Sequence, residues 1–253
     1  MQSVVRVLPA IGGVGEGRGG VPWLVFFPDG VVHAGAAAWF RDLAASDLSP
    51  ASFRSYGYDL LRWFRWLHAC GVEWPRAGRE QVRDFVLFLR GAPVQRRGGP
   101  VAAREAGDRG VGRVGFAPRT INHQLAVLSG FYDFAIQAGT GPLVNPVPAM
   151  GRRTKAVVEH RSPLEPRPLQ RRAAYRQRVP RETPRSLPDM AVEALFNGLR
   201  SNRDRALVAF WLSSGVRASE LLGLCHDRVD YGRRVITVVS KGTRALEEVP
   251  ASA

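Results

Sequence analysis

Two cationic side chains in the last quarter of the chain could act on a phosphate. Arg217 lies where one predicted helix ends and the next begins, and Lys241 lies in a turn between two predicted strands. A residue at a helix start is beside unpaired backbone N–H groups, which favour anions. A guanidinium can clamp the non-bridging oxygens of a phosphate, and an ammonium can protonate a leaving oxygen. An isolated Arg or Lys is usually a solvated surface charge, so spacing alone leaves both interpretations open.

The elements expected to position these two residues are short helices followed by a hairpin. Apolar residues at helical spacing predict helices around residues 192–199 and 207–211. A third helix is expected to begin near Arg217. The β-branched run 234–239 predicts a strand, and residues 246–250 predict the strand that returns.

Upstream, three amphipathic helices are expected to pack as a small bundle. Residues 49–50 supply an N-cap serine and a first-turn proline for the first helix, whose apolar face runs to Leu67. The second begins near Glu80, and Pro118 begins the third, which the glycines from Gly139 onward end. Single amphipathic helices are marginal in water, so packing against one another is required.

Residues 1–34 are expected to form a flexible N-terminal segment with one short extended piece from Trp23 to Phe27. Residues 15–20 formally match the dinucleotide-binding pattern G-x-G-x-x-G. That pattern works only between a strand and a helix, and a strand pattern follows it here. We therefore interpret these glycines as a flexible turn.

Two Arg-rich segments lack any periodicity. Residues 91–117 are interpreted as a mobile loop, either an insertion without a role or an arm that contacts DNA. Residues 151–185 are the predicted linker, because their prolines block a continuous helix. Their concentrated charge favours a strap along a phosphate backbone over a solvated spacer. The basic residues that we expect to bind DNA are Arg119, Arg152, Arg153, Lys155, Arg171 and Arg172.

The composition indicates a polyanionic partner. The chain of 253 residues has 36 Lys and Arg against 22 Asp and Glu, a net charge of +14. This balance favours nucleic acid as the first candidate partner and an anionic membrane surface as the second.

Cys70 and Cys225 have no metal-ligand spacing and are interpreted as core residues of a protein in a reducing compartment. With no apolar run of membrane-spanning length, we expect a cytoplasmic, nucleoid-associated protein of bacterial type that binds no membrane.

The segment around Arg217 resembles the first half of the catalytic domain of the tyrosine recombinases, or phage integrases. The resemblance rests on Gly215 to Leu224, on Asp227 to Asp230, and on the strand that ends in Ser240-Lys241-Gly242. The helices upstream resemble, more loosely, the helical core-binding domain of this family, through residues 50–67 and 120–125 and the pair Asn145-Pro146. Together the resemblance covers roughly residues 35 to 250.

This resemblance implies a mainly α fold. A helical, SAM-like core-binding bundle (35–150) would be followed by an incomplete α+β catalytic domain with a small antiparallel sheet (186–253). It also implies that Arg217 binds the scissile phosphate, that Lys241 is the general acid on the 5′-oxygen leaving group, and that Glu220 helps to hold the arginine. The family integrates and recombines double-stranded DNA through a phosphotyrosine intermediate, with further protomers as partners on DNA and with no metal or other cofactor.

The sequence departs from the family pattern after Lys241. The second half of that pattern contains a His-x-x-Arg segment and a tyrosine nucleophile, and all five tyrosines of this chain precede Lys241. We expect a C-terminally truncated recombinase that binds DNA and is inactive alone, so whether the chain is an enzyme stays open. The alternatives are a non-catalytic DNA-binding regulator of recombination and an unrelated basic protein that associates with RNA or a membrane.

Truncation would also have a structural consequence. We expect Leu221, Val235, Ile236 and Val238 to lack part of their cover, leaving an apolar patch and an open sheet edge.

Overall fold

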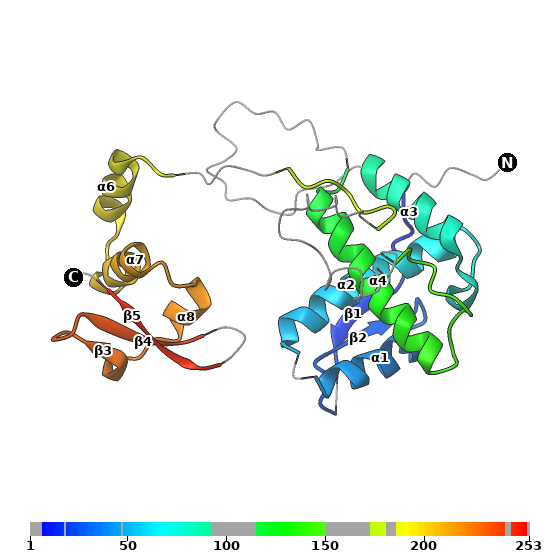
Figure 1. Cartoon of the computed structure of the whole chain (residues 1–253), viewed down its shortest axis with the longest axis horizontal. Helices are drawn as coiled ribbons and strands as arrows, with labels where there is room; N and C mark the ends of the chain where they lie inside the picture. Colours follow the sequence, from blue (N-terminus) through cyan, green and yellow to red (C-terminus); the bar gives the residue numbers. More distant parts are fainter. Residues whose placement is uncertain are drawn as a thin grey trace, which may run out of the picture. The chain divides into compact units, whose positions relative to one another are not determined.

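The computed structural model shows two compact units, Met1–Pro180 and Arg181–Ala253 (Figure 1). It describes residues 7–17, 19–46, 48–92, 115–149, 173–180, 186–240 and 244–251. Within these ranges the chain forms seven α-helices and two small antiparallel sheets. None of the described helices combines the length and the hydropathy that crossing a bilayer requires.

The first unit packs four helices and a hairpin around one core. Its elements are β1 (Gly13–Glu16), β2 (Trp23–Phe26), α1 (Ala34–Ala44), α2 (Pro50–Ala69), the 3-10 turn η1 (Trp74–Arg76), α3 (Arg79–Gly91) and α4 (Pro118–Gln137). The three helices expected from periodicity are confirmed as α2, α3 and α4. Local signals set their ends: Ser49 caps α2 by accepting the N–H of Ser52 at 3.3 Å, and Gly71 beyond its end has a φ of +66°.

A hydrogen-bonded pair of aromatic residues lies in the centre of this core. Trp63 of α2 and Tyr132 of α4 are both fully buried. The Trp63 indole N–H donates to the Tyr132 hydroxyl at 2.9 Å, and that hydroxyl donates to the carbonyl of Trp74 at 3.0 Å. The pair therefore joins three elements, α2, α4 and η1, through a single phenol.

Residues 13–26, which we expected in a flexible N-terminal segment, form a hairpin packed on α2. β1 pairs antiparallel with β2, from Gly13 opposite Phe26 to Glu16 opposite Trp23. The reason is burial: Val25 is fully enclosed in the core, and a Cβ at Gly57 of α2 would lie only 3.0 Å from Val14. The glycine in α2 thus allows the hairpin to approach the helix closely.

The helix α1 was not expected from the sequence, although it completes the bundle. Trp39 and Phe40 are buried on its inner face, and His33 caps its first turn by accepting the N–H of Ala36 at 3.2 Å. The His33 ring is stacked between Phe27 and Phe64, with centroid distances of 4.6 and 3.9 Å. Histidine is an uncommon N-cap, which is why the helix start carries no usual sequence signal.

The second unit combines three helices with a three-stranded sheet. Its elements are α6 (Asp189–Gly198), α7 (Asn202–Ser214), α8 (Ala218–Leu222), the 3-10 turn η3 (His226–Arg228), β3 (Val229–Asp230), β4 (Val235–Val239) and β5 (Leu246–Pro250). The strand order is β3-β4-β5, all antiparallel. The predicted helices and the predicted hairpin of this region are confirmed.

The expected exposure of apolar residues around the sheet is wrong for three of the four residues named. Leu221, Ile236 and Val238 are buried and Val235 is half-buried, because α8 and the sheet cover one another in a small core. Exposed apolar side chains of this unit are found on its helices, at Met190, Leu195, Trp211, Leu212 and Leu222, and on its strands, at Val239 and Leu246.

Both cysteines are exposed, so their assignment to the core is wrong. Cys70 is the C-cap of α2, beyond the apolar face of that helix, and Cys225 directly precedes η3. One exposed thiol therefore lies in each unit.

Most of the two predicted irregular segments falls outside the described residues. Of the predicted loop 91–117, residues 93–114 lie outside them, and its two ends meet where the N–H of Gly115 donates to the carbonyl of Ala92 at 2.9 Å. Of the predicted linker 151–185, the structure describes residues 173–180.

Candidate functional site

Arg217 is presented by a tight helix–helix connection. Gly215 ends α7 with a φ of +67°, a left-handed conformation that suits glycine. Val216 then enters the small core, and Arg217 adopts an extended backbone as the N-cap of α8. The connection takes only three residues, 215–217, so the Arg217 side chain extends from the junction of the two helices.

The carboxylate of Glu220 holds Arg217 in two ways. One oxygen accepts the backbone N–H of Arg217 at 2.9 Å, and the other accepts Nη1 of its guanidinium at 2.8 Å. The Glu220 side chain is 7% exposed, whereas the Arg217 side chain is 66% exposed. A guanidinium has five N–H donors in a planar fork, so Arg217 is oriented by Glu220 and still accessible to an anion.

The local electrostatics of this site come from the guanidinium rather than from the helix. α8 has five residues, and a helix that short has few aligned peptide dipoles to attract an anion. The backbone N–H of Arg217 is also occupied by Glu220. The charge of the guanidinium, rather than unpaired N–H groups at the helix start, is therefore what would attract an anion to Arg217.

Of the other predicted site residues, the structure describes only Arg119. It is exposed near the start of α4 in the first unit. Lys241 lies outside the described residues, in the connection of a hairpin whose flanks pair Val239 with Leu246. The remaining basic residues also lie outside them: Arg152, Arg153, Lys155, Arg171 and Arg172. Of the predicted site residues that it describes, the structure thus brings Arg217 and Glu220 together, and Arg119 belongs to the other unit.

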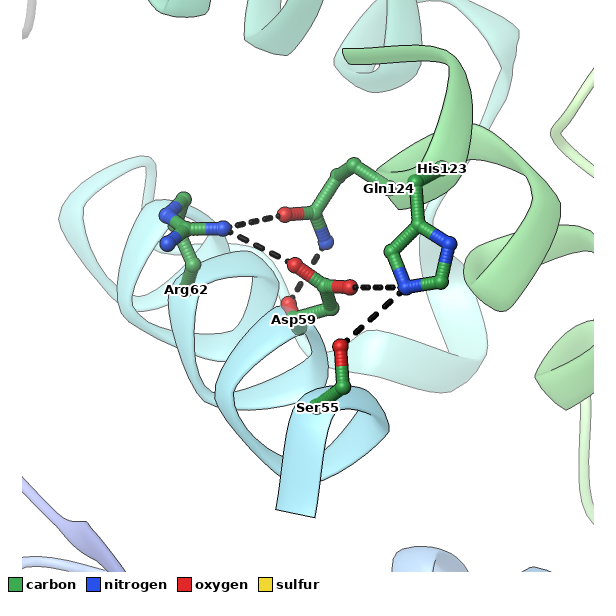
Figure 2. A network of polar contacts seen from close by, with 5 residues as sticks. All are labelled: Ser55, Asp59, Arg62, His123 and Gln124. Atoms are coloured by element: carbon green, nitrogen blue, oxygen red, sulfur yellow. Dashed lines mark hydrogen bonds and ion pairs between the residues drawn. The ribbon is translucent and has the colours of Figure 1, made fainter. Parts of the chain in front are cut away.

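A polar network between α2 and α4, which sequence reasoning missed, lies in the first unit (Figure 2). The carboxylate of Asp59, almost fully buried, is at its centre. Arg62 donates through Nη1 to Asp59 at 3.0 Å and to the amide oxygen of Gln124 at 2.7 Å. Gln124 in turn donates to the backbone carbonyl of Asp59 at 2.6 Å. The spacing of Asp59 and Arg62 on α2 was a signal that could have revealed part of it.

His123 and Ser55 extend this network to the surface. Nε2 of His123 is 3.2 Å from the second carboxylate oxygen of Asp59 and 3.2 Å from the hydroxyl of Ser55. Burial raises the pKa of Asp59, and the positive charges of Arg62 and His123 counter part of that rise. A carboxylate held at the centre of these partners fixes the side chains that surround it.

The Ser55, His123 and Asp59 side chains do not form a catalytic triad. In a triad the histidine contacts the nucleophile through one ring nitrogen and the carboxylate through the other. Here both contacts are made by Nε2 (Figure 2). The second ring nitrogen therefore does not link the histidine to the carboxylate, and the three side chains lack the relay by which a triad activates its serine.

Exposed cations lie on the same two helices. Arg119 is one turn before His123 on α4, and Arg54 is next to Ser55 on α2. The Arg54 guanidinium lies 5.0 Å from the ring centroid of Trp23. These two guanidinium groups add positive charge to the exposed surfaces of α2 and α4.

No family model matches the chain, but searches of curated proteins find relatives. Tyrosine recombinase XerD of Mycobacterium leprae is 30% identical over 206 residues, 80% of this chain and 53% of the relative. Tyrosine recombinase XerC of Chromohalobacter salexigens is 28% identical over 215 residues, 84% of this chain and 57% of the relative. XerC of Xylella fastidiosa strain M23 is 29% identical over 137 residues, 52% of this chain and 38% of the relative.

The curated relatives of this chain are tyrosine recombinases. The chain spans about half the length of the tyrosine recombinases that it matches. Among solved structures, the integrase of transposon Tn1549 in complex with circular intermediate DNA aligns with 86% of the chain and 60% of its own, at 14% identity and a TM-score of 0.46. The integrase of mycobacterium phage Brujita aligns with 87% of this chain and 58% of its own, at 18% identity and a TM-score of 0.34.

Proposed function

We propose that this chain is the front portion of a tyrosine-type site-specific recombinase that binds double-stranded DNA with both of its units. The observation that carries this proposal is the match to XerD of Mycobacterium leprae, which covers 80% of the chain. The match spans 206 residues, which is more than either unit contains, so it includes residues of both units. The helical residues 35–150 would serve as the core-binding domain and residues 186–253 as the first part of the catalytic domain.

In this proposal Arg217 binds the non-bridging oxygens of the scissile phosphate. The equatorial oxygens of a pentavalent phosphoryl transition state carry more negative charge than the ground state, so a guanidinium fixed in advance lowers the barrier. The two contacts from Glu220 supply that fixation. Lys241 would protonate the 5′-oxygen that leaves. Further protomers on the same DNA would be partners of the full assembly.

The helical unit would bind DNA through the exposed donors at the α2–α4 network and through basic side chains, Arg119 among them. The duplex carries a dense row of phosphates, and each contact with a cation releases condensed counterions. The net charge of +14 supports this partner. Arg152, Arg153, Lys155, Arg171 and Arg172 are proposed to add further phosphate contacts.

We predict that the chain binds a duplex with an affinity that falls steeply with salt. Between about 50 and 200 mM salt, the dissociation constant should rise on the order of tenfold or more, because several phosphate contacts are involved. Fluorescence anisotropy with a labelled duplex of random sequence measures this. Arg119→Gln should weaken binding and reduce the slope of log affinity against log salt by about 1.

Arg83→Gln is the matched control for Arg119→Gln. Arg83 is also an exposed helical arginine, but Asp84 pairs with it at 2.8 Å and compensates its charge. This variant should bind DNA as the unmodified chain does. A dissociation constant that does not change with salt would contradict the proposal.

We further propose that residues 1–253 by themselves form no covalent phosphotyrosine. Tyr132 is fully buried in the core, and its burial raises the pKa of the phenol, which opposes its use as a nucleophile. Tyr231, the tyrosine of the second unit, lies beside the ring of His226, at a centroid distance of 6.1 Å. The other three tyrosines belong to the first unit: Tyr56, Tyr58 and Tyr175.

Incubation with a nicked or phosphorothiolate duplex, followed by denaturing electrophoresis, tests this prediction. We expect no protein–DNA adduct under conditions in which anisotropy shows binding. An adduct that Tyr231→Phe abolishes would show that the chain carries its own nucleophile. Translation of the nucleotides beyond codon 253 separates the recombinase from a non-catalytic regulator, because a His-x-x-Arg segment and a later tyrosine would identify the former.

A further inference from the structure

Residues 173–180, which form part of the predicted linker, lie against the helical unit. They are visible in Figure 1 as the yellow-green segment beside α3 and α4. We name these eight residues the strap. The amide side chain of Asn122 in α4 makes two bonds to the backbone of Gln177: its Nδ2 donates to the carbonyl at 3.0 Å, and its Oδ1 accepts the N–H at 2.8 Å. The Asn122 amide therefore supplies the donor and the acceptor that a neighbouring strand would otherwise offer to this backbone.

A second attachment lies two residues before Gln177. Nε of Arg79, the first residue of α3, donates to the Tyr175 hydroxyl at 3.1 Å, and the guanidinium lies 5.6 Å from the ring centroid. Tyr175 also packs against the edge of the core. Its φ is +70°, a left-handed conformation that is costly for a non-glycine residue. The side chain of Gln177 donates to the Tyr175 carbonyl at 2.6 Å and stabilises this bend.

None of the eight strap residues is buried, so these contacts hold the strap on the surface of the bundle. A pocket of about 640 Å³ lies between it and α4, lined in part by Leu125, Val147 and Val179. This pocket is half open to solvent and is therefore a groove at the surface of the unit. An attachment made of a few polar bonds over a pocket can be released without unfolding the bundle.

Attachment of the strap determines how much chain connects the two units. Eight residues, 181–188, lie between the end of the strap and the first residue of α6. If the strap were released, the connection would comprise the 39 residues from 150 to 188. At full extension the first connection could reach at most roughly 28 Å and the second at most roughly 140 Å.

We propose that Asn122 is a positioning residue that keeps the strap on the bundle, and that the docked strap is a releasable device that sets the tether between the units. The docking stands on contacts within the first unit and does not depend on the proposed function. Its consequence for DNA does: a short tether raises the effective concentration of the second unit when the first is bound.

The two native cysteines allow a direct test on the full chain. Cys70 and Cys225 are both exposed, one in each unit. Spin labels on them report the distribution of distances between the units by double electron–electron resonance. Asn122→Ala should broaden this distribution and add longer distances, and Arg79→Ala should do so to a smaller extent. Arg178→Ala, an exposed change on the strap itself, should leave the distribution unchanged.

Hydrogen exchange gives the second readout. The amide N–H of Gln177 should be protected in the unmodified chain, and Asn122→Ala should make it exchange about tenfold faster or more, because its acceptor is lost. Protection within α2 and α4 should persist, which shows that the bundle is still folded. Rapid exchange of Gln177 in the unmodified chain, or an unchanged distance distribution in Asn122→Ala, would overturn the proposal. Failure to bind DNA would overturn the proposed function and leave the strap result intact.

Discussion

Acidification from about pH 6.5 to 4 is expected to cost this protein about 3 kcal/mol of unfolding free energy through one residue, His33. Burial lowers the pKa of His33 from 6.5 to about 4. Its ring is enclosed between Phe27 and Phe64, and its Nδ1 must stay unprotonated to accept the N–H of Ala36. A charge there would be desolvated and would also remove the cap of α1.

The sign of the pH dependence of stability follows from whether the folded or the unfolded state binds the proton first. The unfolded chain protonates His33 below about pH 6.5, whereas the folded protein resists until about pH 4. Between these values the unfolded state binds more protons, so stability falls as the pH falls. Above pH 6.5 both states are neutral at this residue, and its contribution no longer changes with pH.

The measurement is chemical denaturation at a series of pH values, compared with the variant His33→Asn. Asparagine keeps an N-cap acceptor and does not titrate. The variant should be less stable at pH 7 because it loses the stacked ring, but its stability should fall by about 3 kcal/mol less on acidification. Other acidic groups contribute equally to both proteins, so the difference between the two curves isolates His33. Parallel curves would show that His33 titrates normally in the folded state.

Removing one oxygen from the core should destabilise the first unit by about 2–3 kcal/mol. In Tyr132→Phe the indole N–H of Trp63 loses its acceptor and the carbonyl of Trp74 loses its donor. A buried polar group left without a partner costs about 1–3 kcal/mol. Because this phenol joins α2, α4 and η1, the effect should be a loss of stability for the whole unit rather than local fraying.

Tryptophan fluorescence during urea unfolding measures this change, because five of the six tryptophans belong to the first unit: Trp23, Trp39, Trp63, Trp66 and Trp74. Tyr58→Phe is the matched control. Tyr58 is on the same helix as Trp63, but it is exposed, and loss of its hydroxyl should change stability by less than about 0.5 kcal/mol. Equal midpoints for the two variants would contradict the role assigned to the Tyr132 hydroxyl.

The helices and strands whose ends are marked by local signals could be predicted from the sequence alone. Ser49, Pro50 and Gly71 mark the ends of α2, and Gly215 ends α7, because capping and left-handed backbone depend on the residues at those positions. The β-branched run of β4 and its returning partner were found for the same reason. The motif around Arg217 also predicted its neighbour Glu220, three residues away on the same short helix.

Features that depend on residues far apart in the chain could be found only in the folded structure. Asp59 and His123 meet because α2 packs on α4, and Asn122 meets Gln177 across 55 residues. The N-terminal hairpin was mistaken for a flexible segment because its stability comes from burial of Val25 and close approach to Gly57, neither of which a local pattern contains. Periodicity and caps report what a segment prefers alone, whereas partners for a buried carboxylate or an extended strap exist only after the helices have packed.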